Sequence, residues 1–411
     1  MIKLNLVLPE YVQTVFDLLQ NAGHEAYLVG GTVRDAVMGL VPHDFDITTS
    51  ALPEVTEKLF EDHGYRVIDT GLKHGTVTVL CGKEPIEITT FRIDGSYTDA
   101  RHPENVRFTP CLSEDLSRRD FTVNALVYAP QSGLIDLFGG LDDIAAKTLR
   151  CIGEPKKRFS EDALRILRAL RFSAKLDFAI EPQTALAAVE LRGLLARISA
   201  ERITSELLIL FEKGVPNRLA SLLTEFRPIF LQIFPELAAL SMGQYVTLCA
   251  LAARLPTGRE DEACENLRFS YFLAASGCTK ELLSHLRLPN AFTKRVNALA
   301  EALPEAAHVQ SRIDTRKLLS RFGALTCADA AAVLKTGGEN PLLASLLNEC
   351  LQNGDCVSPA ALAINGQDLI RLGFTGAAVG QALNRALLAV MEERVVNTRA
   401  ALLDYLQKSN C

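Results

Sequence analysis

The sequence changes character near Gly153, and this change most constrains what the chain can fold into. Before it, short Val-, Ile- and Thr-rich segments predict strands, and amphipathic segments predict helices. The expected helices span 9–22 and 53–62, and the expected strands span 25–29, 45–49, 67–68, 76–80 and 86–91. After Gly153, Leu- and Ala-rich helical patterns separated by prolines recur, starting with 160–175, 181–195 and 199–213. We therefore expect an α+β fold, with an N-terminal α/β head followed by an all-helical part.

Composition excludes several classes of protein. No run of about 18 uncharged apolar residues is present, so we expect no transmembrane helix. The N-terminal residues contain no basic region that leads into a long apolar stretch, so we expect no secretory signal. The ten cysteines include no C-x-x-C pair, which favours reduced thiols in a cytoplasmic protein over a zinc ribbon or a disulfide framework. The formal net charge of −6 excludes a uniformly basic coat for nucleic acid, so any such contact must use local patches.

The first chemical signal combines a glycine pair with two closely spaced carboxylates. Gly30-Gly31 follows a predicted strand, and a helix starting there would offer free N–H groups and Arg34 to a phosphate. Asp44 and Asp46 are two residues apart, so on a strand both side chains share one face and would bind a divalent cation. The alternatives are a plain tight turn and two unrelated solvated acids.

Two further segments place arginines beside carboxylates. Residues 118–125 begin with Arg118-Arg119-Asp120, and we expect them to open a helix whose Phe121 and Leu126 face a core. In residues 161–172, helical spacing makes Asp162 and Arg165 neighbours, and an acceptor beside a donor is what reading a base edge requires. For both segments, a solvated ion-paired surface is the alternative.

Taken in this order, the motifs resemble those of the bacterial class II tRNA nucleotidyltransferases, or CCA-adding enzymes. These belong to the poly(A) polymerase-like branch of the DNA polymerase beta nucleotidyltransferase superfamily. The resemblance covers roughly the first 210 residues, and the rest matches only in being helical. The matching segments are 28–35, 44–48, 70–76, 91–101, 118–125, 161–172 and 198–203.

The resemblance implies domains and site residues. The head would be residues 1–150, a base-reading neck 151–215, a body 216–300 and a tRNA-binding tail 301–411. Asp44 and Asp46 would hold catalytic Mg²⁺, with Glu87 as a candidate third carboxylate. The implied nucleotide-binding residues are Gly31, Arg34 and Arg119, with Asp162 and Arg165 on the base and Arg168 and Arg171 on the triphosphate. Glu201 and Arg202 would have a structural role in the neck.

Two segments are candidates for contacts with tRNA or for switching between nucleotides. Asp94, Gly95, Asp99 and Arg101 belong to an expected flexible loop that would let the site change from CTP to ATP. Residues 101–175 contain 13 Lys and Arg against 10 Asp and Glu, and Lys156-Lys157-Arg158 is the densest basic run. This run is expected either to hold tRNA phosphates or to be a solvated helix start.

The implied reaction is template-independent addition of CCA to the 3′ end of tRNA. The tRNA 3′-hydroxyl attacks the α-phosphate of CTP or ATP, pyrophosphate leaves, and two metal ions steady the attacking and leaving oxygens. The alternatives are a poly(A) polymerase, an enzyme that adds only CC or only A, a non-catalytic tRNA-binding protein, and a metal-dependent phosphohydrolase. His285 and His308 are isolated, which disfavours the phosphohydrolase. The sequence leaves monomer and homodimer open.

Overall fold

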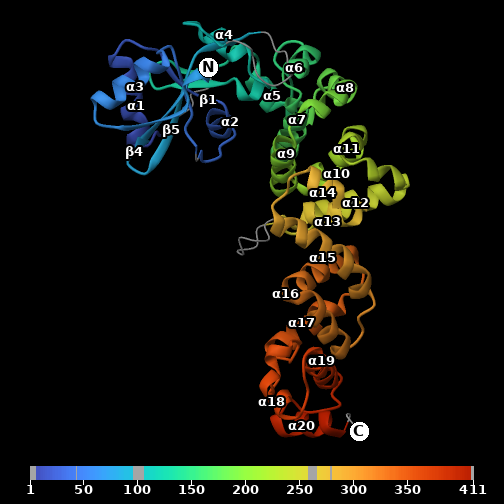
Figure 1. The fold of residues 1–411 in the computed structure, drawn as a ribbon. Helices are drawn as coiled ribbons and strands as arrows, with labels where there is room; N and C mark the ends of the chain where they lie inside the picture. Colours follow the sequence, from blue (N-terminus) through green and yellow to red (C-terminus); the bar gives the residue numbers. More distant parts are fainter. Residues whose placement is uncertain (1–5, 43, 96–105, 258–265, 278–279, 409–411) are drawn as a thin grey trace. The chain divides into compact units, whose positions relative to one another are not determined.

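The computed structural model describes residues 6–42, 44–95, 106–257, 266–277 and 280–408. The chain divides into two compact units, Met1–Pro235 and Glu236–Cys411. In Figure 1, blue to green marks the first unit, and yellow to red marks the second. This division does not test the finer boundaries expected at 150, 215 and 300, which stay predictions.

The first unit is built on a mixed sheet. Within the described residues its strand order is β3-β4-β5-β2-β1-β8-β9, and only β2 and β5 pair in parallel. Two smaller sheets pair β6 with β7 and β10 with β11. The strands are β1 (Ala26–Val29), β2 (Ile47–Thr49), β3 (Arg66–Gly71), β4 (Thr76–Cys81), β5 (Glu84–Thr90), β6 (Arg92–Asp94), β7 (Val106–Phe108), β8 (Val127–Ala129), β9 (Gly133–Ile135), β10 (Thr148–Leu149) and β11 (Ala179–Ile180).

Helices complete the first unit and, after β10, dominate it. They are α1 (Glu10–Asn21), α2 (Gly31–Val37), α3 (Pro53–Asp62), α4 (Leu112–Ser117), α5 (Gly140–Ala145), α6 (Pro155–Glu161), α7 (Leu164–Leu176), α8 (Pro182–Glu190), α9 (Ala200–Lys213), α10 (Pro216–Glu225) and α11 (Arg227–Ile233). The 3₁₀ turns are η1 (Leu72–His74), η2 (Thr122–Asn124) and η3 (Arg192–Arg197). The expected α/β head followed by helices is therefore confirmed.

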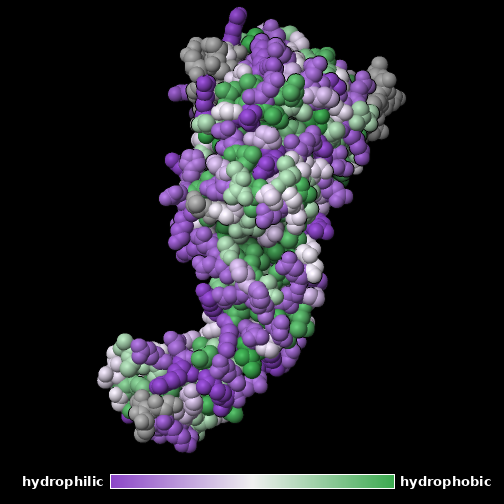
Figure 2. Space-filling model, turned by 90° about the vertical axis from the view of Figure 1, so that its right-hand side faces the viewer, coloured by the Kyte–Doolittle hydropathy of each residue, from purple (hydrophilic) through white to green (hydrophobic). Residues whose placement is uncertain are grey.

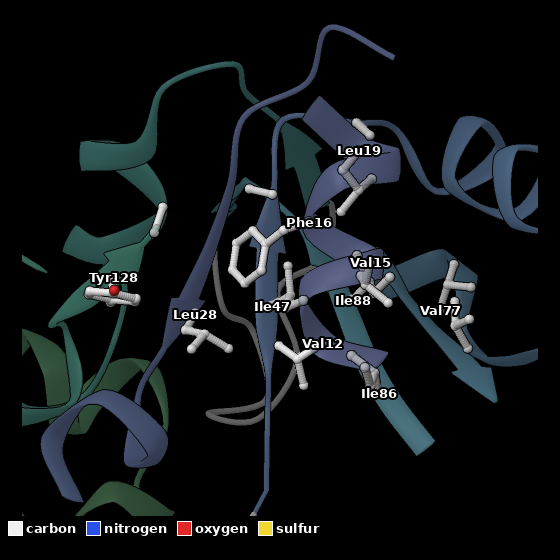
Figure 3. Packing of buried hydrophobic residues seen from close by; sticks show 14 of the residues in the cluster. Val12, Val15, Phe16, Leu19, Leu28, Ile47, Val77, Ile86, Ile88 and Tyr128 are labelled. Atoms are coloured by element: carbon white, nitrogen blue, oxygen red, sulfur yellow. The ribbon is translucent and has the colours of Figure 1, made fainter. Parts of the chain in front are cut away.

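Helix α1 covers one face of the sheet. Its fully buried residues Val12, Val15, Phe16 and Leu19 follow the i, i+3, i+4, i+7 pattern of an amphipathic helix. Figure 3 shows these side chains over Leu28, Ile47 and Ile88 of the central strands. This core holds β1 and β2 side by side. It therefore also limits where the residues just before β2, including Asp44 and Asp46, can lie.

A close backbone contact joins α5 to η2 on another side of the head. A Cβ atom added at Gly140 would collide with the backbone carbonyl oxygen of Thr122 and lie 3.2 Å from Leu126 Cδ2. Only glycine fits there, because the obstacle is backbone rather than a flexible side chain. The turn that carries Thr122 therefore rests directly on the start of α5.

The second unit is helical throughout its described residues. Its helices are α12 (Met242–Arg254), α13 (Leu267–Ala275), α14 (Lys280–His285), α15 (Asn290–Ala307), α16 (Arg312–Gly337), α17 (Leu342–Gln352), α18 (Gly366–Arg371), α19 (Ala377–Met391) and α20 (Arg399–Lys408), with 3₁₀ turn η5 (Pro359–Ala361). One apolar core joins α15, α16 and α17, and another joins α18, α19 and α20. Helix α16 is kinked at Gly323, where φ is +77°.

The described residues also reveal the hydropathy of the helices and the state of the cysteines. None of the described helices is both long and apolar enough to cross a membrane. On the face shown in Figure 2, hydrophilic and hydrophobic residues are interspersed. The cysteines among the described residues carry free thiols.

Candidate active site

A cleft of about 680 Å³ opens in the first unit, and most of the predicted site residues line it. Its walls come from α2, from the segment before β2, from residues 118–124, from Asp162 and α7, and from Arg202 in the first turn of α9. The lining residues are Gly30, Gly31, Thr32, Arg34, Asp35, Pro42, Asp44, Asp46, Arg118, Arg119, Asp120, Asn124, Asp162, Leu164, Arg165, Arg168, Arg171, Phe172, Lys175 and Arg202.

Asp44 and Asp46 lie just before β2 rather than on it, so the expected strand at 45–49 begins two residues late. Their backbone is nevertheless fixed. The Thr32 hydroxyl donates to the carbonyl of Asp44, and the Val29 N–H donates to the carbonyl of Asp46 at 3.1 Å. Both carboxylates face the cleft. The anchors of the pair are therefore α2 and β1.

The electrostatics at Asp46 favour a cation. Desolvation in the cleft raises the pKa of Asp46, and the carboxylates of Glu87 and Asp44 raise it further, while Arg119 opposes them. Repulsion between like charges is relieved when a cation binds between them. Two carboxylate oxygens match Mg²⁺, which keeps several waters and is commonly held by one or two carboxylates plus substrate phosphates.

Glu87 is less well placed than the two aspartates. It lies on β5, whose Ile88 pairs with Ile47 of β2, but it is not among the residues that line the cleft. Across the described ranges, no three His, Cys, Asp or Glu side chains gather as a ready metal site. Its role as a third carboxylate stays a prediction.

The glycine pair positions a buried arginine. Gly30 has φ +74°, a conformation that side chains rarely adopt, and Gly31 begins α2. Arg34 is only 2% exposed. Its guanidinium donates to Asp35 at 2.6 and 2.8 Å and to Asn124 Oδ1 at 2.6 Å. These bonds hold one guanidinium at the floor of the cleft.

The segment 118–125 does not open an α-helix as we expected, and only the turn η2 forms there. Phe121 and Leu126 are fully buried, as predicted. Upstream, the buried carboxylate of Asp115 accepts from Arg118 at 2.8 and 3.0 Å and from Arg119 at 3.2 Å. The Arg pair is thus anchored by α4, because tertiary contacts override the helical pattern.

A second correction concerns Asp162. The expected helix 160–175 is broken there, because Asp162 is extended, with φ −138° and ψ 104°, between α6 and α7. Its carboxylate accepts from the N–H of Leu164 at 3.1 Å and from Arg202 at 3.1 Å. Asp162 and Arg165 are therefore not neighbours on one helix face. Both still line the cleft.

Arg165 is bound from several sides. It donates to Glu161 Oε2 at 3.0 Å, to the carbonyl of Arg158 at 3.2 Å and to the carbonyl of Arg118 at 2.9 Å. A guanidinium has five N–H donors, so two remain for another acceptor. Arg165 links α6, α7 and the Arg118 segment.

Arg168 and Arg171 share a network of carboxylates. Asp120 accepts from Arg168 at 2.6 and 2.8 Å, and Glu206 of α9 accepts from Arg171. Burial by itself raises the pKa of Asp120, but the Arg168 guanidinium outweighs it and brings that pKa to about 2. Asp120 is therefore a carboxylate that holds Arg168 in place.

Phe172 gathers three of these cations around one ring. The guanidinium carbons of Arg34, Arg168 and Arg171 lie 5.5, 5.3 and 4.1 Å from its ring centroid. Distances below about 6 Å are typical of cation–π contacts. Phe172 in turn makes an edge contact with Phe121, with ring centroids 5.9 Å apart. One aromatic ring thus connects the arginines of α2 and α7.

Sequence reasoning missed several residues of the cleft. Arg202 was assigned a structural role, yet it lines the cleft and holds Asp162. Asp120 and Asn124 lay within recognised segments but had no role assigned, and Phe172 was expected only to pack against the core. The acidic residue directly after Arg118-Arg119 was a usable signal for Asp120. No local signal marks Arg202, because its place depends on how α9 packs against α7.

The expected tRNA-binding run, residues 156–158, is not among the residues that line the cleft. Lys156 pairs with Glu190 at 2.7 Å, and Arg158, only 14% exposed, pairs with Glu161 at 2.9 Å. Lys157 is exposed. Of the loop, Asp99 and Arg101 fall outside the described residues, while Asp94 ends β6 and Gly95 follows it.

Three family models match the chain. Residues 26–150 match a poly(A) polymerase head domain, 177–240 a probable RNA- and SrmB-binding site of polymerase A, and 267–406 a putative second domain of tRNA nucleotidyltransferases. Together they cover both units.

Relatives and solved structures extend the likeness along the whole chain. The CCA-adding enzyme of Levilactobacillus brevis is 36% identical over 402 residues, 96% of each chain. That of Lactobacillus helveticus is 34% identical over 406 residues, 96% of this chain and 95% of the other. The crystal structure of the Bacillus stearothermophilus CCA-adding enzyme in complex with CTP has a TM-score of 0.77 at 31% identity and covers 98% of both chains. Full-length identity above 30%, together with the cleft described above, shows that the chain belongs to the family of CCA-adding enzymes.

Proposed function

We propose that this chain adds C, C and A to the 3′ end of tRNA, using CTP and ATP and releasing pyrophosphate without a nucleic-acid template. The observation that carries the proposal is one cleft in which Asp44 and Asp46 face a set of anchored arginines. Full-length relatives named CCA-adding enzymes support it, and so does the likeness to a structure in complex with CTP.

The carboxylate pair would hold the metal. Asp44 and Asp46 supply oxygen ligands, and the raised pKa of Asp46 is consistent with a site that needs a cation. When bound, Mg²⁺ would neutralise phosphate charge and favour deprotonation of the attacking hydroxyl. The protein's own part is to fix the two aspartates through β1 and α2.

The arginines would hold the triphosphate. The cleft lining includes eight Lys and Arg and five Asp, an excess of three positive charges. Arg34, Arg168 and Arg171 are each held by a carboxylate, so binding a phosphate costs little side-chain entropy. Preorganised donors of this kind stabilise charge that develops as pyrophosphate leaves.

Base selection would rest on Asp162 and Arg165. A carboxylate has about four lone-pair positions, so Asp162 can accept the exocyclic NH₂ of cytosine or adenine besides its two bonds to protein. A free N–H of Arg165 would donate to the adjacent ring nitrogen. Uracil and guanine present a carbonyl and an N–H instead, which would leave both protein groups unpaired.

The decisive experiment supplies tRNA that lacks its 3′ CCA with CTP, ATP or both, in the presence of Mg²⁺. CCA addition gives two C from CTP alone and a further A when both nucleotides are present. A poly(A) polymerase would give a long A tail from ATP alone, and a CC-only or A-only enzyme would stop early. No incorporation of either nucleotide would refute the proposal.

Asp44→Ala and Asp46→Ala test the metal assignment. Each should reduce incorporation at least about 10³-fold, because one carboxylate cannot hold the ion against phosphate in the required geometry. Folding should persist, since removing one of two like charges relieves repulsion. Asp62→Ala, at the exposed end of α3, is the matched control. Near-normal turnover in either cleft variant would contradict the assignment.

Deleting residues 95–100 tests the proposed switching loop. CC addition should survive and A addition should fall, because only the change to ATP would need the loop to move. An equal fall for C and A would assign the segment to general binding instead.

We also propose that the enzyme acts in the cytoplasm, since free thiols are maintained in reducing compartments.

A further inference from the structure

One face of α7 carries a line of cations along the cleft. Arg168, Arg171 and Lys175 are spaced i, i+3 and i+7, which places them on the same side of a helix. All three line the cleft, and Lys175 is exposed near the end of α7. Asp162, the proposed base contact, lies just before the other end of α7.

Lys175 differs from its neighbours in having no partner. Each arginine of the cleft lining pairs with a carboxylate, the partners being Asp35, Asp115, Glu161, Asp120, Glu206 and Asp162. Within the parts of the chain that the structure describes, Lys175 has neither an ion pair nor a side-chain hydrogen bond. The arginines are each held by a carboxylate, whereas Lys175 is an exposed point charge at the end of the row.

The order of groups along α7 matches the order of groups along a nucleoside triphosphate. Asp162 would meet the base, and Arg168 and Arg171 would meet the inner phosphates. Lys175 lies four residues beyond Arg171, about 6 Å farther along the helix axis. An ammonium group on a flexible stem suits a terminal phosphate, which carries more charge than the inner ones and is the least constrained.

We propose that Lys175 binds the terminal phosphate of CTP and ATP and thereby selects nucleoside triphosphates over diphosphates. The inference rests on the proposed function, because it takes the base to lie at Asp162. A phosphate of the tRNA backbone is the competing partner for this lysine. Base choice should not depend on Lys175, since it lies at the far end of the row from Asp162.

The test compares Lys175→Gln with the wild-type full chain in binding CTP and CDP, measured as competition with a fluorescent CTP analogue in the presence of Mg²⁺. The affinity for CTP should fall about tenfold, and the affinity for CDP, which lacks the terminal phosphate, should stay within about twofold. Lys175→Arg keeps the charge and should recover most of the CTP affinity. Lys58→Gln, on exposed α3 and outside the cleft lining, removes a charge elsewhere and should change neither.

Steady-state kinetics separate the remaining outcomes. In Lys175→Gln the KM for CTP and for ATP should rise together, while the KM for tRNA and the preference for CTP over UTP should stay unchanged. Equal losses for CTP and CDP, a rise confined to the KM for tRNA, or no change at all would each overturn the inference. If the wild-type chain incorporated no nucleotide into tRNA, the proposed function would fail, while the CTP and CDP binding data would still test Lys175.

Discussion

Both units contain a network of ion pairs between arginines and buried carboxylates, but the two networks have different roles. In the first, Asp120 holds Arg168, and Glu206 holds Arg171. In the second, Asp355 accepts from Arg316 at 2.6 Å and from Arg312 as well, while Glu393 accepts from Arg316 at 2.9 Å. Asp120 and Asp355 both have a pKa of about 2, because their arginine partners outweigh the effect of burial.

What differs is what the arginines face. Arg168 rests against Phe172 and lines a cleft that also holds Asp44 and Asp46. Arg316 instead donates to the carbonyl of Met391, so this network ties the start of α16 to the segments that follow α17 and α19. A buried arginine network therefore indicates a binding site only where donors remain available beside groups that need a ligand.

Among the changes that probe the two networks and the groups beside them, Asp162→Ala should have the largest effect. Use of CTP and ATP should fall by roughly 10²- to 10³-fold, because the acceptor for the exocyclic NH₂ is lost, whereas UTP and GTP should lose little. Initial rates with the four nucleotides measure this. Arg202→Met removes the same ion pair from its other side and should preserve the preference. An unchanged preference for CTP over UTP in Asp162→Ala would mean that other residues read the base.

In the second unit, Asp355→Asn should act on stability. We expect the free energy of unfolding to fall by about 2 kcal/mol, less than for a fully buried pair, because the Arg312 side chain is 30% exposed. Denaturant-dependent labelling of the buried thiols of Cys327 and Cys350 would report it. Asp404→Asn, in an exposed pair with Lys408, should change stability by less than about 0.5 kcal/mol. If the two substitutions lowered the free energy of unfolding equally, the buried pair would stabilise the fold no more than the exposed pair does.

Acid should weaken both networks in the same pH range. A folded-state pKa of about 2 lies below the ordinary Asp value, so each carboxylate stabilises the fold above about pH 4, and this contribution is lost as the pH falls toward 2. Unfolding followed between pH 5 and pH 2 should show this slope. Asp120→Asn should flatten it for the first unit, and Asp355→Asn for the second. If neither substitution changed the dependence of unfolding on pH, other carboxylates would be responsible for the acid sensitivity.

Phe172→Leu should have the smallest effect. The KM for CTP should rise about threefold, because each cation–π contact at such a site is worth roughly 0.5–1 kcal/mol and the carboxylate partners remain. Phe172→Tyr keeps a ring and should stay near wild type. The matched change in the second unit is Phe322→Leu, since Arg321 lies 4.9 Å from the Phe322 ring, and it should leave that KM unchanged. Equal effects of the two leucine variants would remove any special role for Phe172.

Elements set by local patterns were predictable from the sequence. Helix α3 spans Pro53–Asp62, as predicted, because a proline at its first turn and an amphipathic pattern both act locally. The strand β1 and helix α1 followed for the same reason, with bounds within one residue. The order of the motifs along the chain was enough to bring Gly31, Arg34, Asp44 and Asp46 to one cleft.

Elements set by tertiary contacts were not predictable. The periodic run that includes Asp162 indicates one continuous helix, but Asp162 instead bonds the N–H of Leu164, as a residue that precedes a helix does. The contact between Arg34 and Asn124 joins residues 90 positions apart, and Arg202 reaches Asp162 across 40. The two residues of such a pair lie much farther apart in the sequence than the length of one helix or strand, so local patterns cannot link them. The geometry around the proposed base-reading residues Asp162 and Arg165 therefore needed the structure.

The contact between Gly140 and Thr122 makes the enzyme's tolerance of natural variation uneven. Position 140 is outside the cleft lining, yet one added methyl group would press on the turn η2. Asn124 of this turn accepts a hydrogen bond from Arg34, and Asp120, just before the turn, accepts one from Arg168. Gly140→Ala is a chemically conservative substitution, yet it would reduce catalytic activity. By contrast, many changes of charge on the exposed face of α3 would leave activity unchanged. Variants of this gene are therefore better ranked by what their backbone touches than by their distance from the reacting groups.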